Sequence, residues 1–291
     1  DGFHQDDQAW LAQLLANLGQ IASDTAFGGN VIPFRRNTSG VIGAAPADSV
    51  RHFIEDEGVT LMTFLAHAYA ASFDITIDEP ENYNWHGKHP MVIGNSCYIG
   101  NVHLNGSQSA SEQWVLQPEV GPIAFLAATE QGFTNYLLPY TGNFYESFAR
   151  TNYGASIGEH YKSAGLMSQM QTPTIPMMWN VHNFHLEGDP TLTLNTHPLP
   201  DFSVRTEEVF FDPPNVTADL DSFTVAVVVS NLGKATNDVV NVELQRTNTG
   251  LGTNTFNFFT TVDSVYIRDT AYFRVPTLAF SGGQGVNQFT V

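Results

Sequence analysis

The chain has 291 residues, with 29 acidic against 11 basic side chains and a formal net charge of −18 at pH 7. This charge disfavours nucleic acid and anionic membranes as partners, because their phosphates would be repelled. Apolar residues make up 42% of the chain, and no apolar stretch reaches the roughly 18 to 20 residues that span a bilayer. Composition therefore predicts a soluble protein with a sizeable core, which we expect to be divided into two domains.

The chain contains one cysteine, Cys97, in the stretch PMVIGNSCYIGNVH. A single cysteine excludes an internal disulfide and any zinc site built from several thiolates. Cys97 is therefore either an inert core residue or a reactive thiol. The first residues, DGFHQDDQAW, contain neither the basic nor the apolar segment of a signal peptide, so we expect an exported form to be already processed.

Up to about residue 195, helical patterns alternate with short apolar runs. The helical patterns cover residues 6 to 22, 50 to 58, 141 to 151, 155 to 170 and 177 to 186. The runs GVTLMTFLA, PMVIGNS and GPIAFLAAT are apolar throughout, as expected of strands buried on both faces of a parallel sheet. They end near His67, Cys97 and Thr129. The pattern predicts an α/β domain over residues 1 to 198, with a mostly parallel sheet flanked by helices.

From about residue 199 the apolar residues recur at every second position. SFTVAVVVS, VVNVELQ and AYFRVP each place alternate apolar side chains on one face, and turn formers such as DPPN, NLGKATND and SGGQG separate the runs. This pattern predicts an all-β immunoglobulin-like sandwich over residues 199 to 291. The Pro-rich segment THPLPD marks the boundary between the two domains.

Cys97 and His67 each follow an apolar strand immediately, 30 residues apart. Ligands and catalytic groups of α/β sheets gather at the carboxyl ends of the strands. If the two strands are parallel neighbours, both side chains leave the sheet at the same edge, where the imidazole could take the proton of the thiol. The backbone amides of Ala68 and Cys97 are then our candidates for an oxyanion hole.

Structural roles for both residues stay open at this point. A free cysteine at a strand end is commonly a small core hydrophobe. A histidine after an apolar strand is commonly a hydrogen-bonded structural residue. The catalytic interpretation depends on their joint placement.

Four segments, in order, resemble the gingipain-like cysteine peptidases of family C25, whose caspase-like domain is often followed by an immunoglobulin-like module. FIEDEGVTLMTFLAHAY resembles the strand that ends in the catalytic histidine, and HPMVIGNSCYIGNVH resembles the strand that ends in the catalytic cysteine. GPIAFLAATEQGFTNYL is similar to the next strand and the wall of the substrate pocket, and HNFHLEGDPTLTL to the closing Gly-Asp-Pro segment. The resemblance implies that His67 is the general base and Cys97 the nucleophile.

The resemblance also implies export, commonly through the type IX route of Bacteroidetes-like bacteria. The segment PDFSVRTEEVFFDPPNV resembles CARDB-type immunoglobulin-like modules. Such modules imply a spacer or binding role, so we expect a secreted or cell-surface protein that could attach to the surface through its C-terminal domain.

The chain departs from the family pattern in two places. The family usually has Gly-His-Gly around the histidine, whereas this chain has Ala66, His67 and Ala68. Family members also carry an amino-terminal subdomain, and only about 50 residues precede the histidine strand here. The acidic residue that orients the histidine in relatives would come from that subdomain, so this sequence does not identify it.

Glu130 and Phe133 follow the third strand and, if the family alignment holds, line the substrate cleft. Phe133 could form an apolar wall, and Glu130 could meet a basic side chain. An ordinary loop or core role for both is the alternative.

No cofactor is expected. His182 and His185, three apart on the expected helix, have a spacing that could bind a metal, but no third ligand is evident. His86 and His89 lie near the carboxylates of residues 78 to 81, which could hold a structural calcium, although a solvated acidic loop is the ordinary interpretation. Asp189 is expected to fix a turn before the final strand.

Two functions follow. The first is a secreted cysteine endopeptidase that cleaves peptide bonds of protein or peptide substrates with Cys97 and His67. The second is an inactive relative that keeps the fold and serves as a surface or secretion-associated binding or scaffold protein. A carbohydrate-binding module is a weaker third idea, because the sequence shows no clustered aromatic platform.

Overall fold

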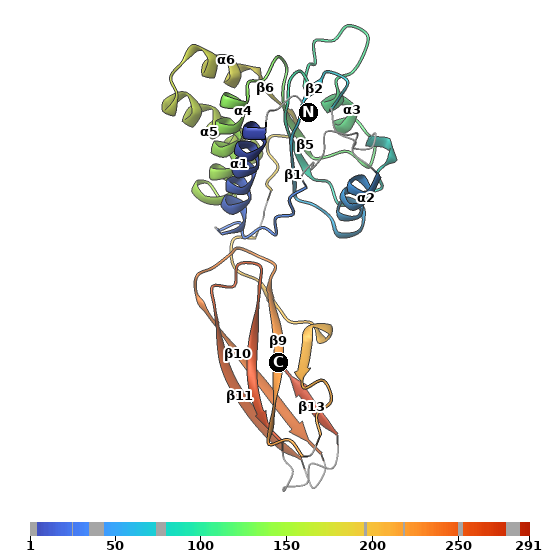
Figure 1. The fold of residues 1–291 in the computed structure, drawn as a ribbon, viewed down its shortest axis with the longest axis vertical. Helices are drawn as coiled ribbons and strands as arrows, with labels where there is room; N and C mark the ends of the chain where they lie inside the picture. Colours follow the sequence, from blue (N-terminus) through green and yellow to red (C-terminus); the bar gives the residue numbers. More distant parts are fainter. Residues whose placement is uncertain are drawn as a thin grey trace. The chain divides into compact units, whose positions relative to one another are not determined.

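A computed structural model describes residues 5–24, 26–34, 44–73, 80–194, 197–217, 219–249, 253–277 and 286–291. The chain divides into two compact units (Figure 1). One comprises the described parts of residues 1–22 and 31–196, and the other those of residues 23–30 and 197–291. No helix among the described residues is long and apolar enough to cross a membrane.

The first unit is built on a four-stranded mixed sheet. Its strands are β1 (Leu61–Leu65), β4 (Met91–Asn95), β5 (Ala124–Ala128) and β6 (Phe184–Gly188), in the order β1-β4-β5-β6. The first three are parallel, and β6 pairs antiparallel with β5. Every residue of β4 and β5 is buried, as expected of apolar strands covered on both faces. The three predicted parallel strands are therefore confirmed.

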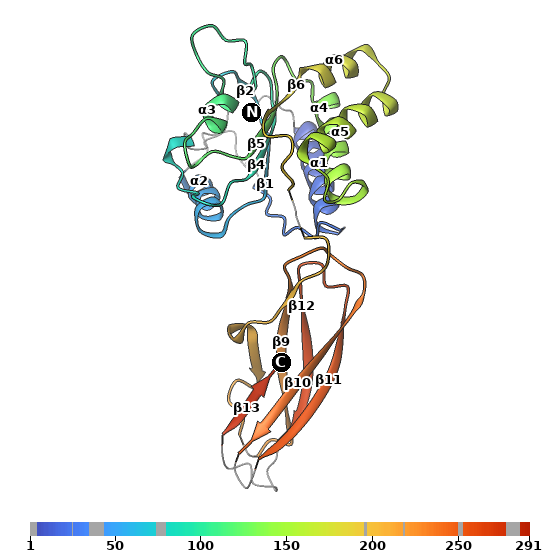
Figure 2. The same cartoon turned by 180° about the vertical axis from the view of Figure 1, so that it is seen from behind.

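Helices cover both faces of this sheet. Figures 1 and 2 place α1, α4, α5 and α6 on one side and α2 and α3 on the other. The helices are α1 (Gln5–Ser23), α2 (Ala44–His52), α3 (Ala110–Val115), α4 (Thr134–Glu146), α5 (Ile157–Gln171) and α6 (Ile175–Asn183). Short π-helical turns η1 (Phe53–Glu57) and η3 (Ser147–Thr151) follow α2 and α4, and a 3-10 turn, η2, spans Pro80–Asn82.

Each face of the sheet has its own apolar core. On the α3 side, Phe125 and Ala127 pack in one cluster with the fully buried Trp85 and with Trp114. On the α4 side, the ring of Phe184 stacks on that of Tyr140, with centroids 4.3 Å apart. The sheet is thus fixed from both sides, which holds its carboxyl edge in place.

The predicted helix over residues 177 to 186 is wrong at its end. Helix α6 stops at Asn183, and Phe184 begins strand β6. The cause is tertiary: Phe184 is buried against Tyr140, and β6 completes its hydrogen bonds on β5. The turn at Asp189 consequently follows this strand and does not precede it, with Asp189 Oδ1 accepting from the backbone N–H of Thr191 at 2.8 Å.

A buried histidine joins α5 to the end of α4. His160 is 1% exposed, and its Nδ1 lies 3.1 Å from Ser147 Oγ. Burial lowers the pKa of His160 below its ordinary value, although its hydrogen bond to Ala155 and the nearby Glu159 act the other way. The neutral imidazole is therefore the form that the folded state favours.

Acid is expected to destabilise the first unit through His160. Because the pKa is lower in the folded state, the unfolded chain binds more protons, and the free energy of unfolding falls as the pH drops below about 6.5. One such group contributes a slope of up to about 1.4 kcal/mol per pH unit. Thermal unfolding of the wild type and of His160→Asn between pH 7.5 and 5 measures this loss of stability. The wild type should lose more stability than the variant, and equal losses would contradict the prediction.

The second unit consists of two antiparallel sheets with a common core. One has the strand order β11-β10-β13, and the other β12-β9-β7 with β8 also paired to β9. Inward side chains of both sheets, among them Val225, Leu244 and Phe273, form one apolar cluster. The strands are β7 (Phe202–Ser203), β8 (Val209–Asp212), β9 (Ser222–Asn231), β10 (Val239–Asn248), β11 (Asn254–Asp263), β12 (Arg268–Pro276) and β13 (Asn287–Thr290), with the 3-10 turn η4 (Thr206–Glu208) before β8.

Candidate active site

The carboxyl ends of β1 and β4 bring the chain segments of His67 and Cys97 to one edge of the sheet. The two strands are parallel neighbours with Leu65 opposite Asn95, and each segment continues two residues further to His67 or Cys97. Neighbouring strands lie about 4.8 Å apart. The hydroxyl of Ser96 ties the two exits together, because it donates a hydrogen bond to the carbonyl of Ala66 at 2.6 Å.

The end of the third parallel strand, β5, and the segment that follows it contact Cys97 and the loop after it. The half-buried thiol donates to the carbonyl of Gly132 at 3.4 Å. The amide of Tyr98 donates to Glu130 O at 2.9 Å, and the amide of Gly100 donates to Ala128 O at 3.0 Å. The loop after Cys97 is therefore fastened to the end of β5 and to the segment that follows it.

The backbone turns sharply immediately after Cys97. Tyr98 has φ of 59°, in the left-handed region that side chains other than glycine rarely adopt. Such a conformation costs roughly 1 to 3 kcal/mol and persists where surrounding contacts impose it, here the bond from the Tyr98 amide to Glu130 O. Nothing in the sequence indicated this turn, because tyrosine is not a residue typical of it.

His67 is exposed and precedes a small hairpin. Strands β2 (Ala68–Tyr69) and β3 (Ser72–Phe73) pair antiparallel, with Ala68 opposite Phe73. Phe73 is buried, and its ring lies 5.1 Å from that of Phe64 on β1. This packing fixes the hairpin that follows His67, and with it the segment that carries His67 and Ala68, against β1.

Glu130 and Phe133 lie on the segment between β5 and α4. Both are exposed, and the carbonyl of Glu130 accepts the Tyr98 bond described above. Phe133 directly precedes α4, and its ring lies 5.8 Å from that of Trp179 on α6. Trp179, itself 37% exposed, was not predicted as part of the site. The aromatic pair forms an apolar surface next to Gly132, the residue whose carbonyl accepts from Cys97.

The histidines considered as metal ligands are not placed as the sequence suggested. His182 belongs to α6 and His185 to β6, so the two do not share a helix. Among the described residues, no group of three or more His, Cys, Asp or Glu side chains is arranged to hold a metal ion. Asp78 and Glu79 of the proposed calcium loop lie outside the described residues.

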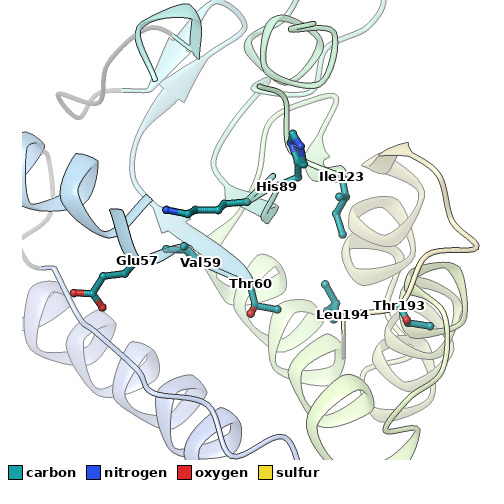
Figure 3. Close-up of a pocket in the computed structure, with 9 residues that line it drawn as sticks. Glu57, Val59, Thr60, His89, Ile123, Thr193 and Leu194 are labelled. Atoms are coloured by element: carbon teal, nitrogen blue, oxygen red, sulfur yellow. The ribbon is translucent and has the colours of Figure 1, made fainter. Parts of the chain in front are cut away.

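A cavity of about 420 Å³ opens at the opposite, amino-terminal edge of the sheet (Figure 3). Thr60, His89 and Ile123, which precede β1, β4 and β5, contribute to its lining. The ammonium group of Lys88 donates to Glu55 O at 2.5 Å and to Asp56 O at 2.7 Å. It therefore binds the backbone carbonyl groups at the end of η1. The cavity contains neither Cys97 nor His67, so it is separate from the site described above.

Comparisons with known proteins place this geometry in context. The model of peptidase family C25 matches residues 5–195. The fold is similar to the crystal structure of the Arg-specific cysteine proteinase gingipain R, with a TM-score of 0.54 at 10% identity over 90% of this chain and 61% of that one. It is also similar to the complex of Porphyromonas gingivalis RgpB pro- and mature domains, with a TM-score of 0.50 at 11% identity over 91% and 62%.

The chain thus spans about three fifths of the length of these two structures. At this level of identity the likeness concerns the fold alone, and the mixed sheet with flanking helices fits the caspase-like gingipain fold. A search of curated protein sequences gives no match.

Proposed function

The chain belongs to peptidase family C25, and from this premise we propose that it is a cysteine endopeptidase with Cys97 as nucleophile and His67 as general base. One observation carries the proposal: the parallel register of Leu65 with Asn95, which brings the segments of both residues to the same edge of the sheet. The turn at Tyr98 supports it, since backbone strain is often stored where a reactive group is presented.

The proposed reaction has two stages. The Cys97 thiol, which donates to Gly132 O in the resting geometry, gives its proton to His67, and the thiolate attacks the scissile carbonyl carbon. The oxyanion accepts hydrogen bonds from the amides of Ala68 and Cys97. The carbon–nitrogen bond then breaks as His67 protonates the departing amine, which leaves a thioester on Cys97.

The second stage releases the acyl group. Water gives a proton to His67 and attacks the thioester carbonyl carbon, and the carbon–sulfur bond breaks to release the carboxylic acid and regenerate the thiol. No cofactor enters this scheme, because the electrons and protons balance between substrate, water and the two side chains.

Phe133 and Glu130 are the proposed substrate-binding residues. The exposed pair of Phe133 and Trp179 offers an apolar wall next to Gly132, the residue whose carbonyl accepts from the thiol. The Glu130 side chain is exposed and provides a carboxylate at the same edge. Protein or peptide substrates with an apolar or basic side chain near the scissile bond fit these two groups.

We also propose that the second unit is an immunoglobulin-like, CARDB-type module of a secreted or surface protein, with the domain boundary near residue 198. Its two antiparallel sheets around a common core support this assignment. Export through the type IX route and attachment through this unit belong to the same proposal and rest on the family membership.

An inactive binding or scaffold protein is the rival function. The feature that favours it is the pair of alanines beside His67, because their methyl groups crowd the approach of a substrate more than glycines would. The thiol of Cys97 also donates to a backbone carbonyl, that of Gly132, at 3.4 Å.

Cleavage of a peptide library separates the two functions. The wild type is expected to cut a defined set of sequences, and Cys97→Ser is expected to lose this activity by several orders of magnitude while keeping the same thermal unfolding curve. A wild type that cuts no better than Cys97→Ser would refute the peptidase proposal and leave the scaffold.

A further inference from the structure

The short helix α3 touches both segments of the candidate active site. The amide of Ala110 donates to the carbonyl of Ala70 at 2.8 Å, and the amide of Ser111 donates to Ile99 O at 3.2 Å. Ala70 lies three residues after His67, and Ile99 two residues after Cys97. The first turn of α3 therefore fixes both segments relative to one another.

This first turn is in turn held by strand β6. The buried hydroxyl of Ser111 donates to Glu187 Oε1 at 2.5 Å, and Glu187 lies opposite Phe125 on β5. Within the chain the bond spans 76 residues. It connects α3 to an edge strand that contributes no residue to the proposed dyad.

A second carboxyl group, that of Glu112, binds the neighbouring Ser109 at the same helix end. Glu112 Oε2 accepts from the amide of Ser109 at 2.8 Å and from its hydroxyl at 2.9 Å. The amide of Glu112 donates back to Ser109 Oγ at 3.3 Å, which completes a capping box at the start of α3. The hydroxyls of Ser109 and Ser111 lie 3.1 Å apart. Two carboxyl groups, Glu112 and Glu187, therefore meet at one helix end through two serines.

The charge of Glu187 is sensitive to pH near neutrality. Burial raises the pKa of its carboxyl group to about 7, the Ser111 bond lowers it, and Glu112 raises it further. Among the described residues of the elements packed here, the titratable groups near Glu187 are Glu112 from α3 and His185, two residues earlier on the same face of β6. Strand β5 presents Phe125 and Ala127. Above pH 7 two carboxylates thus repel one another at the start of α3.

We infer that Glu187 is a positioning residue of the proposed peptidase: through Ser111 it holds the first turn of α3, and thereby the segments of His67 and Cys97, in place. The effect on the reactivity of Cys97 rests on the proposed function. The link from Glu187 to α3 can be measured without any peptidase activity. Ionisation of Glu187 changes this link, because the carboxylate accepts more strongly from Ser111 but is repelled by Glu112.

The test compares Glu187→Leu, which removes the acceptor, with Glu187→Gln, which keeps an acceptor oxygen but cannot ionise. Exposed Glu119, which follows α3, provides the control variant Glu119→Gln. Two readouts are recorded between pH 5.5 and 8.5: the NMR amide shifts of Ala110 and Ser111, and the rate of Cys97 alkylation by iodoacetamide.

In the wild type and Glu119→Gln, the two amide signals should move with a midpoint near pH 7, and Glu187→Gln should abolish this movement. At pH 6, Glu187→Leu should displace both amide signals and slow the alkylation of Cys97 by roughly three- to tenfold, as expected for one lost hydrogen bond. In Glu187→Gln, Cys97 should be alkylated at the wild-type rate. This rescue by glutamine separates positioning from a general loss of stability.

Amide signals that titrate identically in wild type and Glu187→Gln would overturn the inference, even if Glu187→Leu failed to fold. So would a Glu187→Leu protein with unchanged signals and alkylation rate. An unreactive Cys97 in the wild type would refute the proposed function, and the amide signals would still decide whether Glu187 holds α3.

Discussion

His67→Ala is expected to slow the alkylation of Cys97 by iodoacetamide at pH 6 by about 100-fold. An ordinary thiol has a pKa near 8.5, so roughly 0.3% of it is thiolate at pH 6. A cysteine paired with an imidazolium is largely thiolate at that pH. The parallel register of β1 and β4 is the basis of this expectation. The measurement is the second-order rate constant from pH 4 to 9 for both proteins.

The control for this experiment is His103→Ala. His103 is also exposed and lies six residues after Cys97, but it does not stand at the end of a strand of the sheet. Its replacement should leave the profile unchanged. Identical profiles for the wild type and His67→Ala, both following an ordinary thiol, would show that His67 does not activate Cys97.

Gly100→Ala is expected to destabilise the first unit by about 1 to 3 kcal/mol, the usual cost of an overpacked core. A Cβ at residue 100 would lie 2.8 Å from the Cβ of Ala127 and 3.3 Å from its carbonyl carbon and oxygen. Because these atoms belong to a fully buried strand, they have no room to move. The loop after Cys97 must therefore shift, and its bond from the Gly100 amide to Ala128 O is strained or lost.

Gly142→Ala is the matched control for this substitution. Gly142 lies within α4, and a Cβ there would meet no atom within 4 Å. Alanine in an open helical position stabilises by roughly 0.5 to 1 kcal/mol relative to glycine. Chemical denaturation measures both variants, and the thiol alkylation rate should fall in Gly100→Ala alone. Equal stability of the two variants would mean that the loop does not depend on its close approach to β5.

Much of the sheet could be predicted from the sequence because its strands follow a simple physical rule. β4 and β5 are buried on both faces, so their residues are apolar without alternation. His67 and Cys97 stand out because polar or reactive residues end such runs. Their place at one edge of the sheet followed from the parallel order of the strands.

Other features depend on contacts between distant segments and left no local pattern. β6 begins at Phe184 because that ring packs on Tyr140, although the sequence around it continues a helical pattern. Helix α3 has six residues, too few to show a period, and is held by the carbonyls of Ala70 and Ile99. Glu187 carries no local sequence signal of its role, because its partner Ser111 lies 76 residues earlier in the chain.

The most direct test of the account is to label the nucleophile of the proposed reaction with a substrate-like alkylating reagent. A peptidyl chloromethyl ketone, chosen from the sequences cleaved in the library, is added to the wild type and to His67→Ala, and the modified residue is identified by tandem mass spectrometry. We predict one adduct per chain, on Cys97, formed rapidly in the wild type and slowly in His67→Ala. An adduct on another residue, or one that forms equally fast in both proteins, would contradict a Cys97 and His67 dyad.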